Sequence, residues 1–295
     1  MVRLATRSSP LALVQSHAVG KRLIESGLVS SYELVYVATE GDVRLDVAIA
    51  EIARRGVFTA EVEIAVLEGR ADAAVHSAKD LPSSNISPEL VLASVPMRAD
   101  VRDALVGAKL SDLGHGSTIA TGSARRRVQL AALVPGARFV ELRGNIATRL
   151  TKVPHAGAAV FAYAALERLA LVDHASEVLG VESMLPQVGQ GAIALRCRAA
   201  DEQLQEVLAG IDDVVAHRAL LAERAYLARL GGGCDAPVGA YATVDRDSSE
   251  ITLEALLASD DGSRIFRRSA RGDDPLQLGC SLAEELISVF STGTA

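Results

Sequence analysis

The stretch Thr121-Gly122-Ser123-Ala124-Arg125-Arg126-Arg127 and the stretch Leu142-Arg143-Gly144-Asn145-Ile146-Ala147-Thr148-Arg149 repeat one pattern. Each comes just after an apolar, strand-like run and opens a helix. Alternation of strands and helices is typical of an α/β fold with a largely parallel sheet. The two stretches therefore predict the fold class and place five arginines where helices begin.

This placement of arginine has a chemical meaning. A guanidinium group binds a carboxylate or phosphate through two parallel hydrogen bonds, and a helix N-terminus adds free N–H donors and a favourable dipole. Two arginine-rich helix starts side by side predict a site for a ligand with several negative groups. Arginine is also abundant throughout, since only four of the 30 basic residues are lysine. A GC-rich genome is an alternative explanation for that bias.

Composition limits the possible functions. The chain has 295 residues, 49% of them hydrophobic, which predicts two or three domains with sizeable cores. Its formal charge of −7 argues against general binding to nucleic acid or anionic membranes. The N-terminal residues lack the apolar region of a signal peptide, and no apolar run approaches the roughly 20 residues that span a bilayer. The cysteines are three and widely spaced, which predicts no disulfide framework, no zinc site and a cytoplasmic protein.

Strands and helices alternate in two series. In the first series, residues 2–6, 32–38, 72–76 and 90–95 are expected to be strands. Ser9 and Pro10 are expected to start a helix that reaches about Gly27, and residues 58–67 form another. In the second series, residues 118–121, 138–142 and 157–162 are expected to be strands, each followed by a helix.

The glycine-rich residues 188–191 then lead into a strand at 192–198 that is expected to return to the first series. This arrangement predicts two hinged lobes with a cleft between them. From about Asp213 the pattern changes to one long helix over 214–230, three strands and a last helix near 275–290. The expected domains are residues 1–95 with 192–212, residues 96–191, and an α+β domain over 213–295.

Ligands of such sheets bind beyond the carboxyl ends of the strands. Polar motifs follow several predicted strands there, namely residues 7–9, 39–42 and 76–80, in addition to the two arginine stretches. Residues 39–56 form a loop long enough to act as a lid. This coincidence of motifs on one edge predicts an active cleft.

Cys234 lies on a loop with three glycines, Leu230-Gly231-Gly232-Gly233-Cys234-Asp235, where a bulky group can approach closely. The alternative is a helix C-terminus with an incidental buried cysteine. Cys197 falls in an alternating strand and is expected in the core, and Cys280 is expected to face the core from the last helix.

Five motifs, in this order along nearly the whole chain, resemble the porphobilinogen deaminase (hydroxymethylbilane synthase) family: residues 6–12 (TRSSPLA), 76–82 (HSAKDLP), 122–126 (GSARR), 142–145 (LRGN) and 232–234 (GGC). The resemblance implies a three-domain transferase of tetrapyrrole and haem biosynthesis, with two lobes like those of type II periplasmic binding proteins and a smaller α+β domain. It implies a dipyrromethane cofactor bound through a thioether to Cys234. Four porphobilinogen units are added head to tail with loss of ammonia, and hydroxymethylbilane is released by hydrolysis. The family is usually monomeric.

By resemblance, the cofactor is expected to contact Ser77, Lys79, Thr121, Ser123, Arg125, Arg126, Gly144 and Gln190. The substrate is expected to contact Arg7, Ser9, Arg55, Phe58, Arg143, Arg149 and Arg168. The chemistry agrees, because each porphobilinogen ring carries an acetate and a propionate that arginine forks can hold and orient.

Asp80 resembles the catalytic aspartate of the family. A carboxylate there can accept hydrogen bonds from pyrrole N–H groups, stabilise the positive azafulvene formed as ammonia leaves, and help to move the proton. The alternative is a salt bridge to Lys79 or a turn cap before Pro82. His76 is expected to be a core histidine without a catalytic role.

One segment departs from the family pattern. Many relatives carry a lysine and a Leu-Phe pair before the first-lobe helix, whereas this chain has Arg54-Arg55-Gly56-Val57-Phe58. Arg55 keeps the positive charge, but it cannot donate a proton, because arginine stays protonated in proteins.

Two other classes of function compete with the enzyme. A non-catalytic two-lobe anion binder would need neither Cys234 nor Asp80, and it would carry no covalent adduct. A nucleic-acid-binding protein could use the arginine clusters, but the net charge and the lack of interleaved aromatic residues argue against it.

Overall fold

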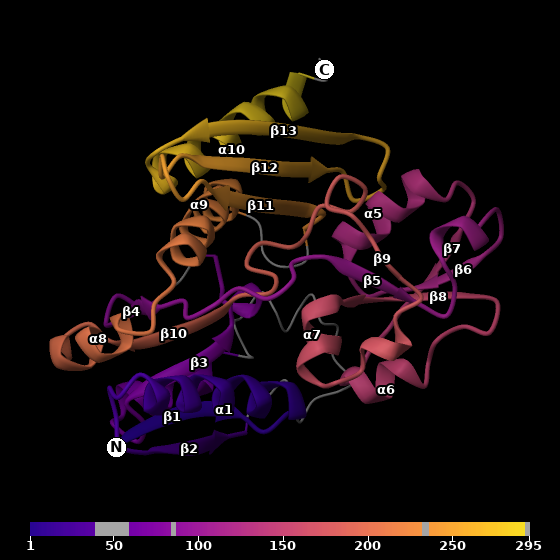
Figure 1. The fold of residues 1–295 in the computed structure, drawn as a ribbon. Coiled ribbons are helices and arrows are strands. Elements are labelled where there is room, and N and C mark those ends of the chain that lie inside the picture. Colours follow the sequence, from indigo (N-terminus) through magenta and orange to yellow (C-terminus); the bar gives the residue numbers. More distant parts are fainter. Residues whose placement is uncertain (39–58, 84–86, 232–235, 293–295) are drawn as a thin grey trace.

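The computed structural model describes residues 1–38, 59–83, 87–231 and 236–292 (Figure 1). Every structural statement below concerns these residues. The predicted sites at Arg55, Phe58 and Cys234, and the proposed lid over 39–56, lie outside them.

The first sheet has the strand order β2-β1-β3-β10-β4. It is formed by β1 (Val2–Arg7), β2 (Tyr32–Val37), β3 (Ala73–Ser77), β4 (Leu90–Ser94) and β10 (Ile193–Arg198). β1 pairs in parallel with β2 and β3, whereas β10 lies antiparallel between β3 and β4. The predicted return of the chain to the first series is therefore confirmed.

Helices α1 (Pro10–Glu25), α4 (Ala60–Leu67) and α8 (Glu202–Ala209) accompany this sheet. The start of α1 follows from its sequence, because the Ser9 hydroxyl accepts a hydrogen bond from the Ala12 N–H and Pro10 occupies the first turn. Val19 and Leu23 of α1 pack in the buried core on the strands. The end of β1 and the start of α1 are thus fixed beside each other.

The second sheet has the strand order β7-β6-β8-β5-β9. Its elements are β5 (Asp103–Val106), β6 (Thr118–Ala120), β7 (Arg138–Val140), β8 (Gly157–Ala162) and β9 (Glu177–Val178), with helices α5 (Ala124–Leu133), α6 (Ile146–Leu150) and α7 (Tyr163–Arg168). β6, β7 and β8 are parallel, as the alternating pattern predicts. β5 was not predicted, and it runs antiparallel to β8 with all four residues buried.

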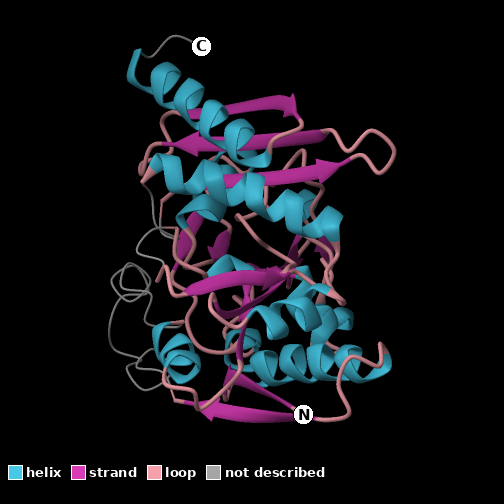
Figure 2. Ribbon diagram, turned by 90° about the vertical axis from the view of Figure 1, so that its left-hand side faces the viewer, coloured by secondary structure: helices cyan, strands magenta, loops and turns pink. Residues whose placement is uncertain are grey.

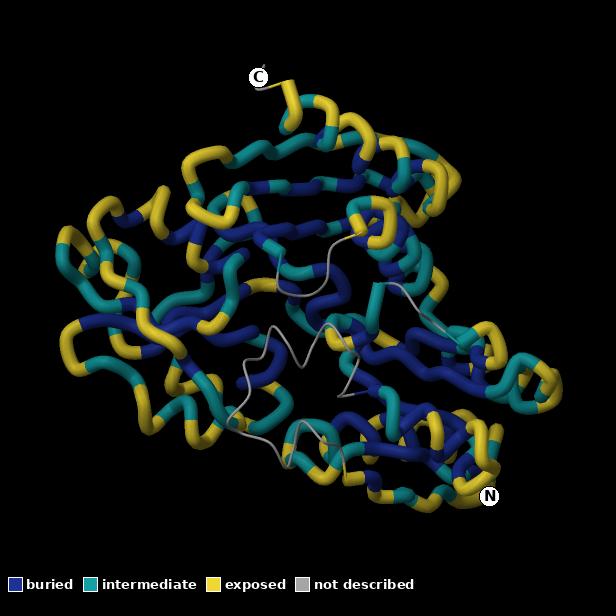
Figure 3. Tube along the Cα trace, turned by 180° about the vertical axis from the view of Figure 1, so that it is seen from behind, coloured by how far each residue is buried: buried dark blue, intermediate teal, exposed yellow. Residues whose placement is uncertain are grey.

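The third sheet is an antiparallel meander of β11 (Val238–Val244), β12 (Ile251–Ala258) and β13 (Ile265–Gly272). The helices α9 (Val214–Leu230) and α10 (Pro275–Thr292) lie along one face of it (Figure 2). Tyr226 and Leu282 belong to the core between them. In Figure 3 the inner strands of the three sheets are buried along most of their length, and the exposed segments are mainly loops and outer helix faces. The edge strands β2, β7 and β13 are mostly intermediate or exposed.

Two crossing segments, residues 96–100 and 187–192, join the first two sheets and contact each other. The Ala99 N–H donates to the Gly191 carbonyl at 3.0 Å. Gly191 has a φ of 84°, and a Cβ there would stand 2.4 Å from the Ala99 carbonyl oxygen. This close approach requires glycine. Gly189 packs in the same way against the backbone of Ala78 and Lys79, so the crossing touches the residues that follow β3.

Candidate active site

Asp80 lies on a short 3₁₀ turn, η1 (Ala78–Asp80), that begins where β3 ends. The Ala78 N–H donates to the Ala192 carbonyl at 3.0 Å, which fixes this turn against the crossing segment. The Asp80 side chain is exposed, while Lys79 beside it is partly buried. The predicted catalytic carboxylate therefore projects from the carboxyl end of a core strand.

Charged groups of both lobes affect the pKa of Lys79. Burial lowers the pKa of Lys79 to about 8, although the neighbouring Asp80 carboxylate raises it, and the Arg126 guanidinium of the second lobe lowers it further. Burial also lowers the pKa of Arg149, with a second lowering contribution from Arg126 and an opposing one from Asp80. The structure thus brings Lys79 and Asp80 of the first lobe near Arg126 and Arg149 of the second.

A small cavity marks the contact between the two lobes. Its lining includes Gln15, Ser77 and Lys79 from the first lobe and Arg168 from α7. Ser77 and Gln15 are hydrogen-bonded at 2.9 Å. Arg168 donates to the Gly191 carbonyl at 2.7 Å, so this arginine contacts the crossing segment. The predicted hydroxyl and arginine sites of both lobes therefore face one space.

The hydroxyl groups of the second lobe shape the start of α5. The Ser123 hydroxyl accepts from the Arg126 N–H at 3.4 Å, and the Thr121 hydroxyl accepts from the Ser123 N–H at 3.2 Å. The Asn145 side chain caps α6 by accepting from the Thr148 N–H at 2.9 Å. These bonds explain why both arginine stretches turn into helices at the predicted residues.

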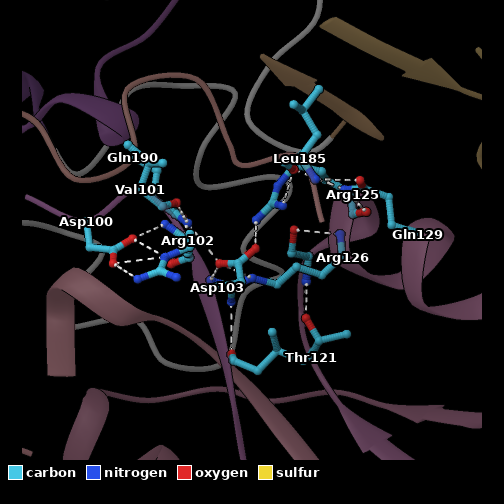
Figure 4. A network of polar contacts seen from close by, with 12 residues as sticks. Asp100, Val101, Arg102, Asp103, Thr121, Arg125, Arg126, Gln129, Leu185 and Gln190 are labelled. Atoms are coloured by element: carbon cyan, nitrogen blue, oxygen red, sulfur yellow. Dashed lines mark hydrogen bonds and ion pairs between the residues drawn. The ribbon is translucent and has the colours of Figure 1, made fainter. Parts of the chain in front are cut away.

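Arg125 and Arg126 share one buried carboxylate, Asp103 of β5 (Figure 4). Arg125 Nη2 lies 2.7 Å from Asp103 Oδ2, and Arg126 Nη2 lies 2.8 Å from Asp103 Oδ1. Burial alone would raise the pKa of Asp103, but the two guanidinium groups hold it well below its usual range. Arg125 is 2% exposed and Arg126 is 8% exposed.

Gln190, predicted as a cofactor contact, is fully buried in the same cluster. Its Nε2 donates to Asp103 Oδ1 at 2.8 Å and to the Val101 carbonyl at 2.7 Å. Sequence reasoning missed Asp103. The signal that could have found it is an aspartate at the start of the apolar run Asp103-Ala104-Leu105-Val106, because a charge in a buried strand needs a partner.

The other described arginines of the predicted site are partly buried. Arg149 Nε donates to the Gly144 carbonyl at 2.7 Å, which joins two predicted contact residues. Arg143 lies 3.6 Å from Glu141 and is partly exposed. Arg7 is the last residue of β1 and Ser9 follows it, at the same edge of the sheet as Asp80, as predicted.

His76 is 5% exposed, and burial followed by the charge of Arg196 lowers its pKa to about 3. It is therefore a neutral core histidine, as expected. The prediction for Cys197 is also confirmed, since this thiol is fully buried. Cys280 is partly buried on α10.

The charge balance of this site fits an anionic group. Lys79, Arg125, Arg126 and Arg149 surround only two carboxylates, Asp80 and Asp103, so the neighbourhood is positive in a chain whose formal charge is −7. Arg125 Nε is buried and has no hydrogen-bond partner among the described residues. Cationic donors held out of water bind carboxylates strongly. A dipyrromethane with its acetate and propionate groups matches these donors.

Two further properties belong to the described part of the chain. None of its helices is long and apolar enough to cross a membrane. Within the same residues, no group of three or more histidine, cysteine, aspartate or glutamate side chains is placed to hold a metal ion.

Known proteins resemble this chain over most of its length. Residues 2–206 match a family model described as "Porphobilinogen deaminase, dipyromethane cofactor binding domain", and residues 217–288 match "Porphobilinogen deaminase, C-terminal domain". The chain is 44% identical over 291 residues to a porphobilinogen deaminase of Roseiflexus sp., and the alignment covers 96% of this chain and 95% of that protein. It is 40% identical to one of Brevibacillus brevis, over 97% of this chain and 94% of that protein. Among solved structures, an ancestral cationic amino acid solute binding protein aligns with a TM-score of 0.42 and 13% identity, over 71% of this chain and 87% of that chain.

Proposed function

The chain belongs to the porphobilinogen deaminase family, and we propose that the cationic cleft beside Asp80 is where it carries out the family's reaction. It is a transferase of tetrapyrrole biosynthesis, a hydroxymethylbilane synthase with a dipyrromethane cofactor. It condenses four porphobilinogen units head to tail, loses ammonia at each addition, and releases hydroxymethylbilane by hydrolysis. The observation that carries the assignment of the cleft is the surplus of partly or fully buried cations around one exposed carboxylate.

Cys234 is the proposed attachment point of the cofactor. When bound, the cofactor supplies the pyrrole terminus to which new rings are joined. Lys79 and Arg126, two cations that influence each other across the lobes, would hold its carboxylates. Ser77, Thr121, Ser123 and Gly144 complete this side of the cleft, while Arg125 and Gln190 contribute through their bonds to Asp103.

The incoming porphobilinogen is held by a second set of groups. Arg7, Ser9, Arg143, Arg149 and Arg168 belong to it, together with Arg55 and Phe58. Arginine suits this role because its charge is permanent and its fork fixes the plane of a carboxylate. Proper orientation of each ring brings the reacting carbon atoms together and lowers the entropic barrier.

Asp80 is the proposed catalytic residue. Its exposed carboxylate accepts hydrogen bonds from pyrrole N–H groups and offsets the positive charge that develops on the substrate ring as ammonia departs. It would also accept the α-proton that the terminal ring of the growing chain loses after its α-carbon has attacked the substrate ring, which restores the aromaticity of that terminal ring.

We propose domain boundaries at residues 95/96, 191/192 and 212/213, because the chain forms three separate sheets and passes between the first two through the two crossing segments. A cytoplasmic location and a monomeric state are likewise proposed. Porphobilinogen is the small-molecule partner, and neither nucleic acid nor a membrane is expected to bind.

An assay of the purified chain with porphobilinogen tests this function. We expect four ammonia molecules per released tetrapyrrole, which converts spontaneously to a porphyrinogen and is detected as porphyrin after oxidation. A chain that binds porphobilinogen without releasing ammonia would instead be a non-catalytic binding protein.

A further inference from the structure

We propose that Asp103 is a positioning residue of this site, which holds the guanidinium of Arg126 toward the cleft and ties it, through Gln190, to the segment that joins the lobes. The inference rests on the proposed function of the cleft. It gives a role to a carboxylate that is buried away from any substrate.

Side chains from three residues donate hydrogen bonds to the Asp103 carboxylate. Its Oδ1 accepts from Arg126 Nε at 3.2 Å, from Arg126 Nη2 at 2.8 Å and from Gln190 Nε2 at 2.8 Å. Its Oδ2 accepts from Arg125 Nη2 at 2.7 Å. The carboxylate is fully buried. Four hydrogen bonds on one carboxylate fix the planes of both guanidinium groups.

The two arginines then point to different places. Arg125 Nη1 donates to the Leu185 carbonyl at 2.6 Å, and its Cδ lies 3.3 Å from where a Cβ on Gly239 of β11 would stand. Arg125 therefore packs between the second lobe and the third sheet. Arg126 Nη1 donates to the Val160 carbonyl at 2.9 Å, and its charge reaches Lys79 and Arg149. Arg126 is also the more exposed of the two, at 8% against 2% for Arg125, and is thus the member of the pair assigned to the cleft.

Gln190 connects this cluster to the crossing segment. Its backbone carbonyl accepts from Arg98 Nε at 3.0 Å, and the preceding Gly189 N–H donates to Glu223 of α9 at 2.8 Å. The segment that joins the lobes is thus hydrogen-bonded to the carboxylate that orients Arg126.

The charge count explains why one carboxylate serves two arginines. Asp103 neutralises one of the two buried positive charges and leaves the other for a ligand carboxylate. Without Asp103 both guanidinium groups would be buried without a counter-ion, which is strongly unfavourable. At least one of them would then leave its present position.

Asp103→Asn tests the proposal, because it keeps the shape and removes the charge. The matched control is Asp100→Asn, which deletes the same kind of group from an ion pair with Arg102 at the protein surface. Intact-mass measurement gives the fraction of folded chains that carry the cofactor. We expect that fraction to fall at least tenfold in Asp103→Asn and to stay at the wild-type value in Asp100→Asn. A wild-type fraction in folded Asp103→Asn would overturn the proposal.

Gln190→Met provides the second variant, since it removes the donor to Asp103 and to the Val101 carbonyl while it keeps the volume and both ion pairs. Gln190 Oε1 has no hydrogen-bond partner among the described residues, so its loss leaves no donor stranded. We expect a folded protein with a lowered unfolding midpoint, because the buried Val101 carbonyl loses its donor, together with a reduced loaded fraction and a porphobilinogen KM in the loaded enzyme raised about fivefold or more with kcat changed less. If Asp103→Asn does not fold, an unchanged loaded fraction and KM in Gln190→Met overturn the proposal. If only the role of Asp103 is wrong, the wild-type chain still carries the cofactor and is active. A wild-type chain without cofactor contradicts the proposed function itself.

Discussion

Arg98 and Glu223 form a two-pronged ion pair that joins the crossing between the lobes to helix α9, with Nη1–Oε1 at 2.5 Å and Nη2–Oε2 at 3.0 Å. Glu223 is fully buried and also accepts from the Gly189 and Ala242 N–H groups, each at 2.8 Å. One carboxylate of the third sheet's helix therefore holds both crossing segments and strand β11. The same helix leads to Gly231 and the loop of Cys234.

Glu223→Gln is expected to destabilise the protein by about 3–5 kcal/mol, because the buried Arg98 guanidinium loses its counter-ion. Urea unfolding of the wild type and the variant measures the difference. Glu284→Gln is the control, since its pair with Arg229 is about half exposed and should matter by less than about 1 kcal/mol. Equal effects of the two substitutions would show that the buried Glu223 ion pair stabilises the protein no more than an exposed pair does.

Asp80→Asn is expected to leave the fold and the cofactor in place and to lower turnover at least 10²-fold. The amide cannot offset the positive charge that develops on the substrate ring, and it cannot accept the proton. Steady-state rates, together with the intact mass of the same preparation, measure both quantities. Turnover near that of the wild type would make Asp80 a turn residue that pairs with Lys79.

Arg126→Leu is expected to yield mainly protein without cofactor. Loss of one charge-assisted contact amounts to roughly 1.5–3 kcal/mol, or about 10–150-fold in occupancy. Arg125→Leu is expected to give the same result, because it removes the hydrogen bond to Asp103 Oδ2, leaves Asp103 with Arg126 and Gln190 alone, and opens the contact with Gly239. Arg127→Leu, at the exposed third position of the run, is the matched control and should load normally. Normal loading of all three variants would contradict this role of the arginine run.

Arg143→Leu is expected to keep the cofactor but to stall during elongation, because this partly exposed arginine contacts the incoming rings. Mass spectra recorded after addition of porphobilinogen should show an altered distribution of one-ring steps. A distribution equal to that of the wild type would place Arg143 outside the substrate site.

The porphobilinogen KM of the loaded enzyme is expected to rise above about pH 8, because Lys79, proposed to hold the cofactor to which the substrate is joined, loses its charge there. Burial lowers the pKa of Lys79 from 10.5 to about 8, so this lysine loses its charge as the pH rises through that value. In the absence of ligand, the buried charge of Lys79 lowers the free energy of unfolding below about pH 8. This destabilisation disappears as the pH rises from 8 to 10.5, because the unfolded chain binds more protons than the folded chain in that range. The porphobilinogen KM between pH 7 and 9.5 should rise more steeply in the wild type than in Lys79→Gln. Parallel profiles would show that Lys79 does not hold a carboxylate.

The sequence predicted most of the architecture because the strands and helix starts carry local signals. Ser9 with Pro10 starts α1, the two arginine stretches start α5 and α6, and the long helix over 214–230 has the observed bounds. The return of the chain through β10 was predicted from the glycines before it. These glycines permit the close approach of the crossings, which is a local property of the backbone.

The residues that escaped prediction depend on partners distant in the sequence. β5 begins with Asp103, and a strand of four residues with a charge at its start has no recognisable alternation. Its stability comes from Arg125, Arg126 and Gln190, which lie up to 87 positions away. Arg125 was predicted as a ligand contact like Arg126, since pattern alone cannot tell which of two adjacent arginines faces a cleft.

The mass of the intact purified protein tests the central claim most directly. The account predicts a chain heavier than its sequence by two condensed pyrrole units, with the additional mass on the peptide that contains Cys234 and a pink colour with Ehrlich's reagent. Cys234→Ser should have the bare mass and no activity. A wild-type chain with the bare sequence mass that nevertheless makes the tetrapyrrole would contradict the account.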